Sequence, residues 1–288
     1  MLLRFLAPAL VLLAAPLHSQ TPQEVLTSTI TRLETDLEAR VGIQILDTAT
    51  GRTWGHRQDE RFLMASTFKS VLCGGVLQGV DRGEINLEEK LKVDAEVPRN
   101  SPVTERYLGG SLSVARLCLA TLDQSDNGAA NLLIDRMGGT QAVTEFLRGI
   151  GDSVTRLDRK EPEMNLFTPG DPRDTTSPAA MVASWQALLA GDALSSASRA
   201  QLIEWMSIGS VTGALLRPAV PKGWQVADRS GGGRDHTRNI VAMLKPPGRA
   251  PFFVAIYLSD TPANWSTRNA AVAELSAAVV AEIETLVE

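Results

Sequence analysis

The sequence predicts an α+β (mixed α/β) fold in which an antiparallel sheet flanked by helices lies beside an all-helical domain. Strand patterns occur near the start of the chain and again after Gly223, whereas helical patterns dominate the middle. We therefore expect a discontinuous domain of residues 20–60 and 207–288 and a helical domain of residues 61–206. The cleft between them is the default place for a functional site.

The composition limits the classes of partner. The chain has 288 residues, a formal net charge of −5, a pI of about 5.4 and the composition of a soluble globular protein. This acidic balance gives no indication of nucleic-acid binding. No apolar surface stripe is evident, so we expect a monomer.

Residues 1–19 have the pattern of a secretory signal peptide. Residues 1–4 carry one positive charge, residues 5–17 are almost wholly apolar, and Ser19 offers a small residue for cleavage. An apolar run of about thirteen residues is too short to span a bilayer, and no later run reaches about eighteen. We therefore expect a secreted protein with no membrane segment after cleavage.

The first part of the expected sheet is a hairpin that follows an N-terminal helix. Thr21 and Pro22 are typical of a helix start, and the helix should run to about residue 39. Residues 41–47 and 52–56 alternate as strands do, with turn residues between them.

The second part of the sheet comes from the end of the chain. Residues 226–230, 238–244 and 252–258 have the pattern of an antiparallel set of strands. Thr261 and Pro262 should then cap a final amphipathic helix that runs to about residue 287.

Ser66 and Lys69 stand three residues apart where an apolar helical run begins, over about residues 66–80. Side chains three positions apart on a helix are neighbours, so the serine oxygen and the lysine nitrogen can meet. A serine hydroxyl becomes a good nucleophile when a base takes its proton, and a desolvated lysine can be that base. Backbone N–H groups at a helix start can stabilise an oxyanion. The S-x-x-K pattern alone arises about once by chance in such a chain, and a surface serine with a solvated lysine explains it better.

Other motifs also have ordinary explanations when each is taken alone. Residues 125–127 can be a polar turn before a helix, and residues 161–165 can be a solvated acidic loop. Residues 228–233 end a strand with glycines, as a strand end or a bulge does. The two cysteines, Cys73 and Cys118, can form a disulfide in an exported protein or remain two buried thiols.

Together and in this order, the motifs resemble those of the class A serine β-lactamases. S-x-x-K, S-D-N, an E-x-x-x-N loop and a basic-S/T-G triplet are signatures of that family. Residues 97–104 are similar to its site-entrance segment and residues 159–174 to its omega loop, so the likeness covers nearly the whole mature chain. The resemblance implies the fold shared by serine β-lactamases and penicillin-binding proteins, in a bacterial periplasmic enzyme. Cys73 and Cys118 stand where many members carry a disulfide.

The resemblance also implies the catalytic roles. Ser66 attacks the lactam carbonyl, and the backbone N–H groups of Ser66 and Gly232 form the oxyanion hole, where glycine permits close approach. Lys69 and Ser125 relay protons, and Ser125 delivers one to the leaving lactam nitrogen.

The omega loop and the S-D-N motif supply the remaining polar groups of the implied site. Glu161 and Asn165 hold the water that attacks the acyl-enzyme, and Asn127 orients Lys69 and binds the substrate's side-chain amide. Either Lys69 or Glu161, acting through that water, can be the base for acylation, and both remain open. The bond between Glu161 and Pro162 is implied to be cis.

The implied substrate-binding residues at the end of the sheet are Arg229, Ser230, Gly231, Gly232 and Arg238. Two arginines suit the ring carboxylate because a guanidinium matches it by paired hydrogen bonds. Asn100 lies at the site entrance, where the family usually has an aromatic residue. Arg159 and Asp174 are implied to pair across the neck of the omega loop.

The triplet that begins with Arg229 departs from most members, which have lysine, and resembles the carbenicillin-hydrolysing subgroup. We therefore expect hydrolysis of penicillins, including those with a side-chain carboxylate, and of some cephalosporins, which gives antibiotic resistance. No cofactor and no metal ion are expected; the only partners expected are small-molecule β-lactam substrates.

Two further classes of protein compete with this interpretation. A penicillin-binding or sensor protein is acylated without releasing the drug, but it lacks a deacylation base such as Glu161. A His-dependent serine hydrolase or a metal hydrolase needs a histidine base or clustered ligands, and the mature chain offers only His56 and His236.

Overall fold

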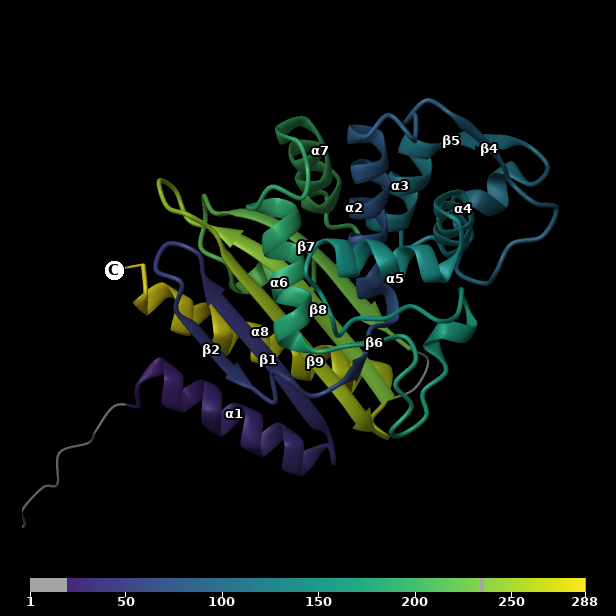
Figure 1. The fold of residues 1–288 in the computed structure, drawn as a ribbon. Helices are drawn as coiled ribbons and strands as arrows, with labels where there is room; N and C mark the ends of the chain where they lie inside the picture. Colours follow the sequence, from purple (N-terminus) through teal and green to yellow (C-terminus); the bar gives the residue numbers. More distant parts are fainter. Residues whose placement is uncertain (1–19, 234–235, 288) are drawn as a thin grey trace, which may run out of the picture.

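The computed structural model describes residues 20–233 and 236–287 of the chain. The expected signal peptide, residues 1–19, lies outside the described residues. The predicted α+β fold is confirmed: an antiparallel sheet carries helices on both faces, and a helical part lies beside it (Figure 1).

The main sheet has five strands in the order β2-β1-β9-β8-β7, and all neighbouring pairs are antiparallel. The strands are β1 (Arg40–Asp47), β2 (Thr53–His56), β7 (Gln225–Gly232), β8 (His236–Lys245) and β9 (Phe252–Thr261). Strand β1 pairs with β9, so the two ends of the chain meet in the middle of the sheet. Strand β7 lies at the edge of the sheet and faces the helical part.

Helices α1 (Pro22–Asp36) and α8 (Trp265–Thr285) cover one face of the sheet and share an apolar core with it. Helix α1 begins where expected, with a capping box between Thr21 and Glu24. The expected cap of the last helix is wrong, because the Thr261 hydroxyl donates to the carbonyl of Leu37 instead. The cap is Asn264, whose side chain accepts from the backbone N–H of Thr267.

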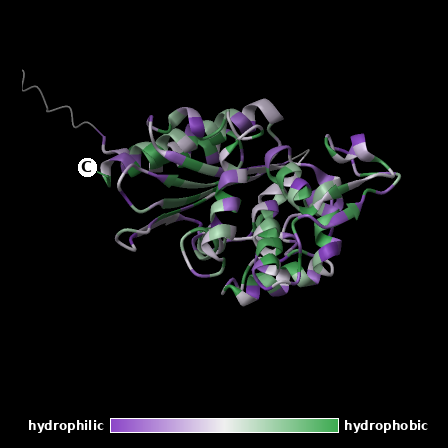
Figure 2. Ribbon diagram, turned by 90° about the horizontal axis from the view of Figure 1, so that it is seen from above, coloured by the Kyte–Doolittle hydropathy of each residue, from purple (hydrophilic) through white to green (hydrophobic). Residues whose placement is uncertain are grey.

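The other face of the sheet packs against the helical part, which Figure 2 shows beside the sheet in a view from above. Its helices are α2 (Phe68–Asp81), α3 (Val114–Asp123), α4 (Asn127–Met137), α5 (Thr140–Gly149), α6 (Pro178–Leu189) and α7 (Ser196–Ser207). Its short strand pairs are β3 (Phe62–Leu63) with β6 (Thr175–Thr176) and β4 (Lys90–Lys92) with β5 (Ser111–Ser113). The 3-10 turns are η1 (Ala65–Thr67), η2 (Thr104–Tyr107), η3 (Glu163–Asn165) and η4 (Arg217–Ala219).

Helix α2 lies at the centre of the helical part and is buried on nearly all sides. Two of its glycines allow close neighbours: a Cβ on Gly74 would lie 2.8 Å from Leu188, and one on Gly75 would lie 2.6 Å from Met137. A helix that is enclosed in this way is fixed by packing rather than by its own propensity. The turn η1 that precedes it is therefore held on a rigid support.

The predicted disulfide is wrong for this structure. Cys73 on α2 and Cys118 on α3 are both buried free thiols, and the Cys73 thiol donates to the backbone carbonyl of Cys118 at 3.8 Å. Burial raises the pKa of the Cys118 thiol well above its usual range, and the neighbouring Cys73 thiol raises it further. The protonated thiol therefore suits this apolar site.

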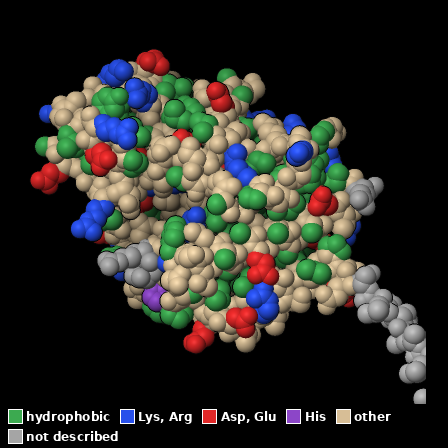
Figure 3. All heavy atoms as spheres, turned by 180° about the vertical axis from the view of Figure 1, so that it is seen from behind, with side chains coloured by type: hydrophobic (Ala, Val, Ile, Leu, Met, Phe, Trp, Pro, Cys, Tyr) green, Lys and Arg blue, Asp and Glu red, His purple; other side chains and the backbone are tan. Residues whose placement is uncertain are grey.

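Acidic and basic side chains are interspersed over the face seen from behind in Figure 3. Among the described helices, none combines the length and the apolar character needed to cross a membrane.

Candidate active site

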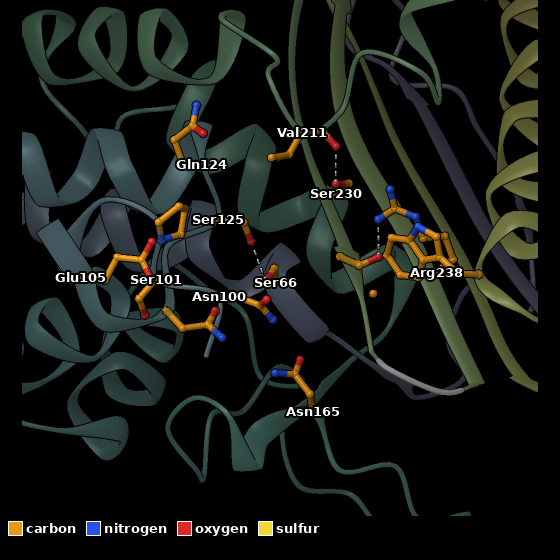
Figure 4. A pocket seen from close by; sticks show the side chains of 15 residues that line it. Ser66, Asn100, Ser101, Glu105, Gln124, Ser125, Asn165, Val211, Ser230 and Arg238 are labelled. Atoms are coloured by element: carbon orange, nitrogen blue, oxygen red, sulfur yellow. Dashed lines mark hydrogen bonds between the residues drawn. The ribbon is translucent and has the colours of Figure 1, made fainter. Parts of the chain in front are cut away.

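A cavity of about 560 Å³ opens between strand β7 and the helical part of the chain. Its walls come from η1, the segment before α4, the omega loop and the end of the sheet, as Figure 4 shows. Predicted site residues that line it are Ser66, Asn100, Ser125, Asn127, Asn165, Ser230, Gly231, Gly232 and Arg238. Lys69, Glu161 and Arg229 are fully or almost fully buried around it. The structure thus gathers the four motifs around one cavity.

Ser66 lies in the turn η1, one residue after Ala65, whose φ of +43° is unusual for a residue with a Cβ. The surrounding contacts hold this strained turn in place. The Thr67 hydroxyl donates to the Met64 carbonyl at 2.8 Å, and the Asn239 side-chain amide donates to the same carbonyl at 3.2 Å. Helix α2 was expected to begin at Ser66, but its α-helical part begins at Phe68, so the serine sits on a 3-10 turn.

Strand β7 approaches η1 closely at a glycine. A Cβ on Gly231 would lie 2.7 Å from the Met64 carbonyl oxygen and 3.1 Å from the Ser66 nitrogen. A Cβ on Gly232 would instead lie 2.7 Å from the ring of Trp265. Gly231 therefore permits the contact between the sheet and η1, and Gly232 leaves room for the tryptophan.

Lys69 is fully buried, and four oxygen atoms surround its amine. It donates to the Ser125 carbonyl at 2.8 Å, to Asn127 Oδ1 at 2.6 Å and, at 3.4 Å, to Ser125 Oγ, and it lies 3.2 Å from Glu161 Oε1. An environment of oxygen acceptors suits an ammonium ion, which has only N–H donors. Burial lowers the pKa of Lys69 from 10.5 to about 8, although the nearby Glu161 carboxylate opposes the shift. At neutral pH most of the amine is therefore charged.

Ser125 connects Ser66 to the buried cations. Its hydroxyl donates to Ser66 Oγ at 3.1 Å (Figure 4). The same hydroxyl accepts from Arg229 Nη2 at 2.6 Å and from Lys69 Nζ at 3.4 Å. The direct meeting of Ser66 and Lys69 that the helical spacing predicted is thus replaced by a bridge through Ser125. A proton can move between the nucleophile and the buried amine through this hydroxyl.

Asp126, between the two functional members of S-D-N, fixes the entrance segment. Its carboxylate accepts from the backbone N–H groups of Val103 and Thr104 at 2.8 and 2.9 Å. It also accepts from the N–H of Ala129 and so caps helix α4. Asn100 lies in the same segment with a φ of +63°, and its carbonyl accepts from the Asn127 N–H at 3.0 Å.

Glu161 is buried between Lys69 and Asn165. Its Oε1 lies 3.2 Å from the lysine amine, and its Oε2 accepts from Asn165 Nδ2 at 2.5 Å. Asn131 bonds the backbone of Glu161 twice, accepting from its N–H at 3.0 Å and donating to its carbonyl at 2.9 Å. The bond between Glu161 and Pro162 is cis, as implied. We did not predict Asn131, although its place four residues after Asn127 on one helix puts both on one face.

Arg159 and Asp174 meet at the neck of the omega loop. Arg159 Nε donates to Asp174 Oδ2 at 2.5 Å, and Asp174 Oδ1 accepts from the N–H groups of Asp158 and Arg159 at 2.7 and 2.9 Å. The Asp174 side chain is fully buried. Loss of Arg159 would leave a buried carboxylate without its charged partner, which is more costly than the loss of a surface ion pair.

Two arginines lie at the end of the sheet: Arg238 lines the cavity, whereas Arg229 is fully buried behind it. Burial lowers the pKa of both Arg229 and Arg238 to about 10, and the positive charge of Arg229 also lowers that of Arg238. Both arginines remain cations at neutral pH because this value lies well above 7. Arg238 donates to the Gly231 carbonyl at 3.0 Å and to Asn269 Oδ1 at 2.6 Å. Among the described residues, Arg229 Nε and Nη1 have no hydrogen-bond partner. Arg238, which lines the cavity, can bind an anion, and the charge of Arg229 behind it favours the same ligand.

Two residues that contact Arg238 were not predicted from the sequence. Asn269 orients Arg238, and Trp265 lies beneath its guanidinium with the ring centroid at 4.6 Å. Both belong to helix α8, about 30 residues beyond the last motif, and no local pattern connects them with the cavity.

The arrangement defines a serine hydrolase of the acyl-transfer type. A strained turn presents the nucleophile, a hydroxyl links it to a buried ammonium, and a buried carboxylate stands where it can act on a water molecule. Arg238 lines the cavity where a carboxylate of the substrate can bind, and Arg229 lies buried behind it.

Comparisons with known proteins identify the family. The model of the Beta-lactamase enzyme family matches residues 25–283. A β-lactamase of Rhodobacter capsulatus is 48% identical over 266 residues, which are 92% of this chain and 90% of the relative. The chain belongs to the β-lactamase enzyme family.

Solved structures agree with this assignment. The crystal structure of a β-lactamase from Xanthomonas campestris pv. campestris superposes with a TM-score of 0.88 at 44% identity, covering 91% of this chain and 99% of that one. The class A β-lactamase of the last common ancestor of Gram-negative bacteria gives a TM-score of 0.87 at 47% identity, over 90% of this chain and 99% of that one. These matches support class A.

Proposed function

We propose that this chain is a periplasmic class A penicillinase that hydrolyses the β-lactam amide of penicillins, and of some cephalosporins, through an acyl-enzyme on Ser66. Such an activity gives resistance to these antibiotics. The observation that carries the proposal is Glu161, a buried carboxylate held between Lys69 and Asn165 at the edge of the cavity. We infer export from the signal-peptide pattern of residues 1–19. The intact mass of the exported chain tests whether this segment has been removed.

Acylation begins when Ser66 Oγ attacks the lactam carbonyl. Glu161 takes the serine proton through a water molecule held with Asn165, because the charged Lys69 has no free lone pair. Ser125 gives its proton to the lactam nitrogen as the bond between that nitrogen and the carbonyl carbon breaks. The Lys69 ammonium reprotonates Ser125, and Glu161 returns its proton to Lys69, 3.2 Å away, so the carboxylate is free again for deacylation. The backbone N–H groups of Ser66 and Gly232 stabilise the oxyanion.

Deacylation uses the same carboxylate. The water between Glu161 and Asn165 attacks the ester carbonyl of the acyl-enzyme while Glu161 takes its proton. The proton then returns to Ser66 Oγ as the acyl group leaves. A protein that is acylated without release has no need of a carboxylate in this position, so Glu161 favours an enzyme over a penicillin-binding or sensor protein.

The first test is turnover of benzylpenicillin by the purified mature chain with a metal chelator present, followed by intact mass. We expect many turnovers per enzyme molecule. A stable one-to-one adduct without turnover would instead indicate a β-lactam-binding sensor or peptidase.

Carbenicillin should be hydrolysed with a kcat/KM within about tenfold of that for benzylpenicillin. The reason is the positive charge of Arg229 and Arg238 at this end of the sheet, which favours a second carboxylate on the substrate. Steady-state kinetics with both penicillins measure this ratio. Arg229→Lys is the matched control, because it keeps the charge but loses the paired geometry, and it should lower the ratio of carbenicillin to benzylpenicillin. A far lower kcat/KM for carbenicillin in the unmodified enzyme would contradict the prediction.

The pH dependence of acylation should show whether Lys69 is charged or neutral when it takes part in the reaction. Lys69 has a lowered pKa of about 8, so it is charged below that pH and neutral above it. Because the mechanism uses the charged amine, kcat/KM for benzylpenicillin should fall as the pH rises through about 8. A pH profile of kcat/KM measures this limb. A rate that instead rises through the same pH would make neutral Lys69 the acylation base.

A further inference from the structure

Trp265 lies in the cavity wall but belongs to none of the catalytic motifs. It is the first residue of α8 and lines the cavity, and 47% of its surface is exposed. Among the described residues that line the cavity, it is the one aromatic side chain. The side chains at the entrance on the helical side include Asn100, Ser101 and Glu105, which are polar. The large apolar surface of the cavity is therefore on the side of the sheet.

The indole is held in one position by its neighbours. The guanidinium carbon of Arg238 lies 4.6 Å from the ring centroid and that of Arg268 lies 5.5 Å away, both within the range of cation–π contacts. The other constraint is the backbone of Gly232, where an added Cβ would lie 2.7 Å from Cζ3 and 2.8 Å from Cη2 of the ring. The ring thus packs against Gly232, whose N–H we assign to the oxyanion hole under the proposed function.

We infer that Trp265 is a specificity-determining residue, whose exposed ring binds the part of a β-lactam next to its ring carboxylate. The inference rests on the proposed function. A carboxylate bound by Arg238 brings the carbon atoms beside it to the indole, because the guanidinium and the indole are stacked. A flat aromatic or cationic substituent at that place has the greatest contact with the ring. Cephalosporins with such a 3-substituent are the substrates that should gain most.

The test compares two cephalosporins with the same 7-side chain, one with a 3-pyridiniomethyl group and one with a 3-methyl group. We divide the kcat/KM for the 3-pyridiniomethyl compound by that for the 3-methyl compound. In Trp265→Leu this ratio should fall roughly tenfold. Trp265→Phe keeps an aromatic ring and should recover most of the ratio. Because each ratio is taken within one enzyme, the different intrinsic reactivities of the two drugs cancel between variants.

Benzylpenicillin serves as the reference substrate and separates specificity from a merely structural role. If Trp265 only supports Arg238, Trp265→Leu will weaken all three substrates equally through KM, and the inference is overturned. An unchanged ratio overturns it as well. If the unmodified enzyme hydrolyses none of the three, the proposed function fails first, before any variant is compared.

A double-mutant cycle examines the contact between Trp265 and Gly232. Gly232→Ala places a methyl group against the indole, so it should lower the kcat/KM for the 3-pyridiniomethyl compound when the tryptophan is present. The same change in the Trp265→Leu background should have a much smaller effect. Additive effects would show that Gly232 does not make room for the ring. Thermal melting of each variant confirms that it is folded.

Discussion

Ser66→Ala should abolish covalent labelling by penicillins and lower the turnover of benzylpenicillin by roughly 10⁴-fold or more. The turn that carries Ser66 is fixed by contacts of other residues, such as the bond from the Thr67 hydroxyl to the Met64 carbonyl. The variant should therefore fold normally while it lacks the nucleophile. Intact mass after incubation with benzylpenicillin, together with steady-state kinetics, measures both effects.

Ser70→Ala is the matched control for this variant. Ser70 lies on helix α2 one turn beyond Ser66, and its hydroxyl donates to the Thr67 carbonyl and accepts from Trp185 Nε1, away from the cavity. Its loss should lower stability by about 1–3 kcal/mol, because the tryptophan N–H is left unpaired, but the adduct should still form. An adduct on the Ser66→Ala protein, mapped for example to Ser125, would move the nucleophile to another residue.

The fold could be predicted from the sequence where the local pattern and the tertiary environment agree. Strands β1 and β9 are buried over almost their whole length because each lies inside the sheet, and both are rich in apolar residues. The hairpin and the first helix have clear turn and cap residues. The cap of α8 was misplaced because Thr261 and Asn264 are both good cap residues. Only the bond from Thr261 to the Leu37 carbonyl, more than 200 residues away, decides between them.

The residues around the cavity could be named from motifs, but their contacts could not. Helical spacing placed Ser66 beside Lys69, yet the amine is drawn away by the Ser125 carbonyl, Asn127 and Glu161, which come from other segments. Trp265 and its contact with Gly232 depend on how helix α8 crosses the end of strand β7. That arrangement is a property of the packed core and leaves no periodic trace in the sequence.

The same limit applies to the cysteines. Cys73 and Cys118 were paired by resemblance, and they do lie near each other in the structure. Proximity does not define a bond, however, because a disulfide also needs a specific geometry of both side chains. The sequence spacing carries no information on that geometry.

Glu161→Gln should convert the enzyme into one that is acylated by benzylpenicillin but releases the product very slowly. The glutamine keeps the size of the side chain but cannot take a proton from the deacylating water, so deacylation should slow by roughly 10²–10⁴-fold. Intact mass should show nearly complete labelling at Ser66 within a short incubation. Glu163→Gln, an exposed residue two positions along the same loop, is the matched control and should leave turnover unchanged.

Acylation should survive in Glu161→Gln because removal of the carboxylate alters Lys69. The negative charge of Glu161 raises the pKa of the lysine, so its loss should lower that pKa below about 8 and increase the neutral fraction of the amine. The neutral amine can then take the Ser66 proton through Ser125. The rate of acylation of the variant, measured by single-turnover kinetics, should therefore increase as the pH rises. The kcat/KM of the unmodified enzyme should instead fall. Turnover at the normal rate by Glu161→Gln, or acylation with the same falling limb in both proteins, would show that Glu161 is not the base.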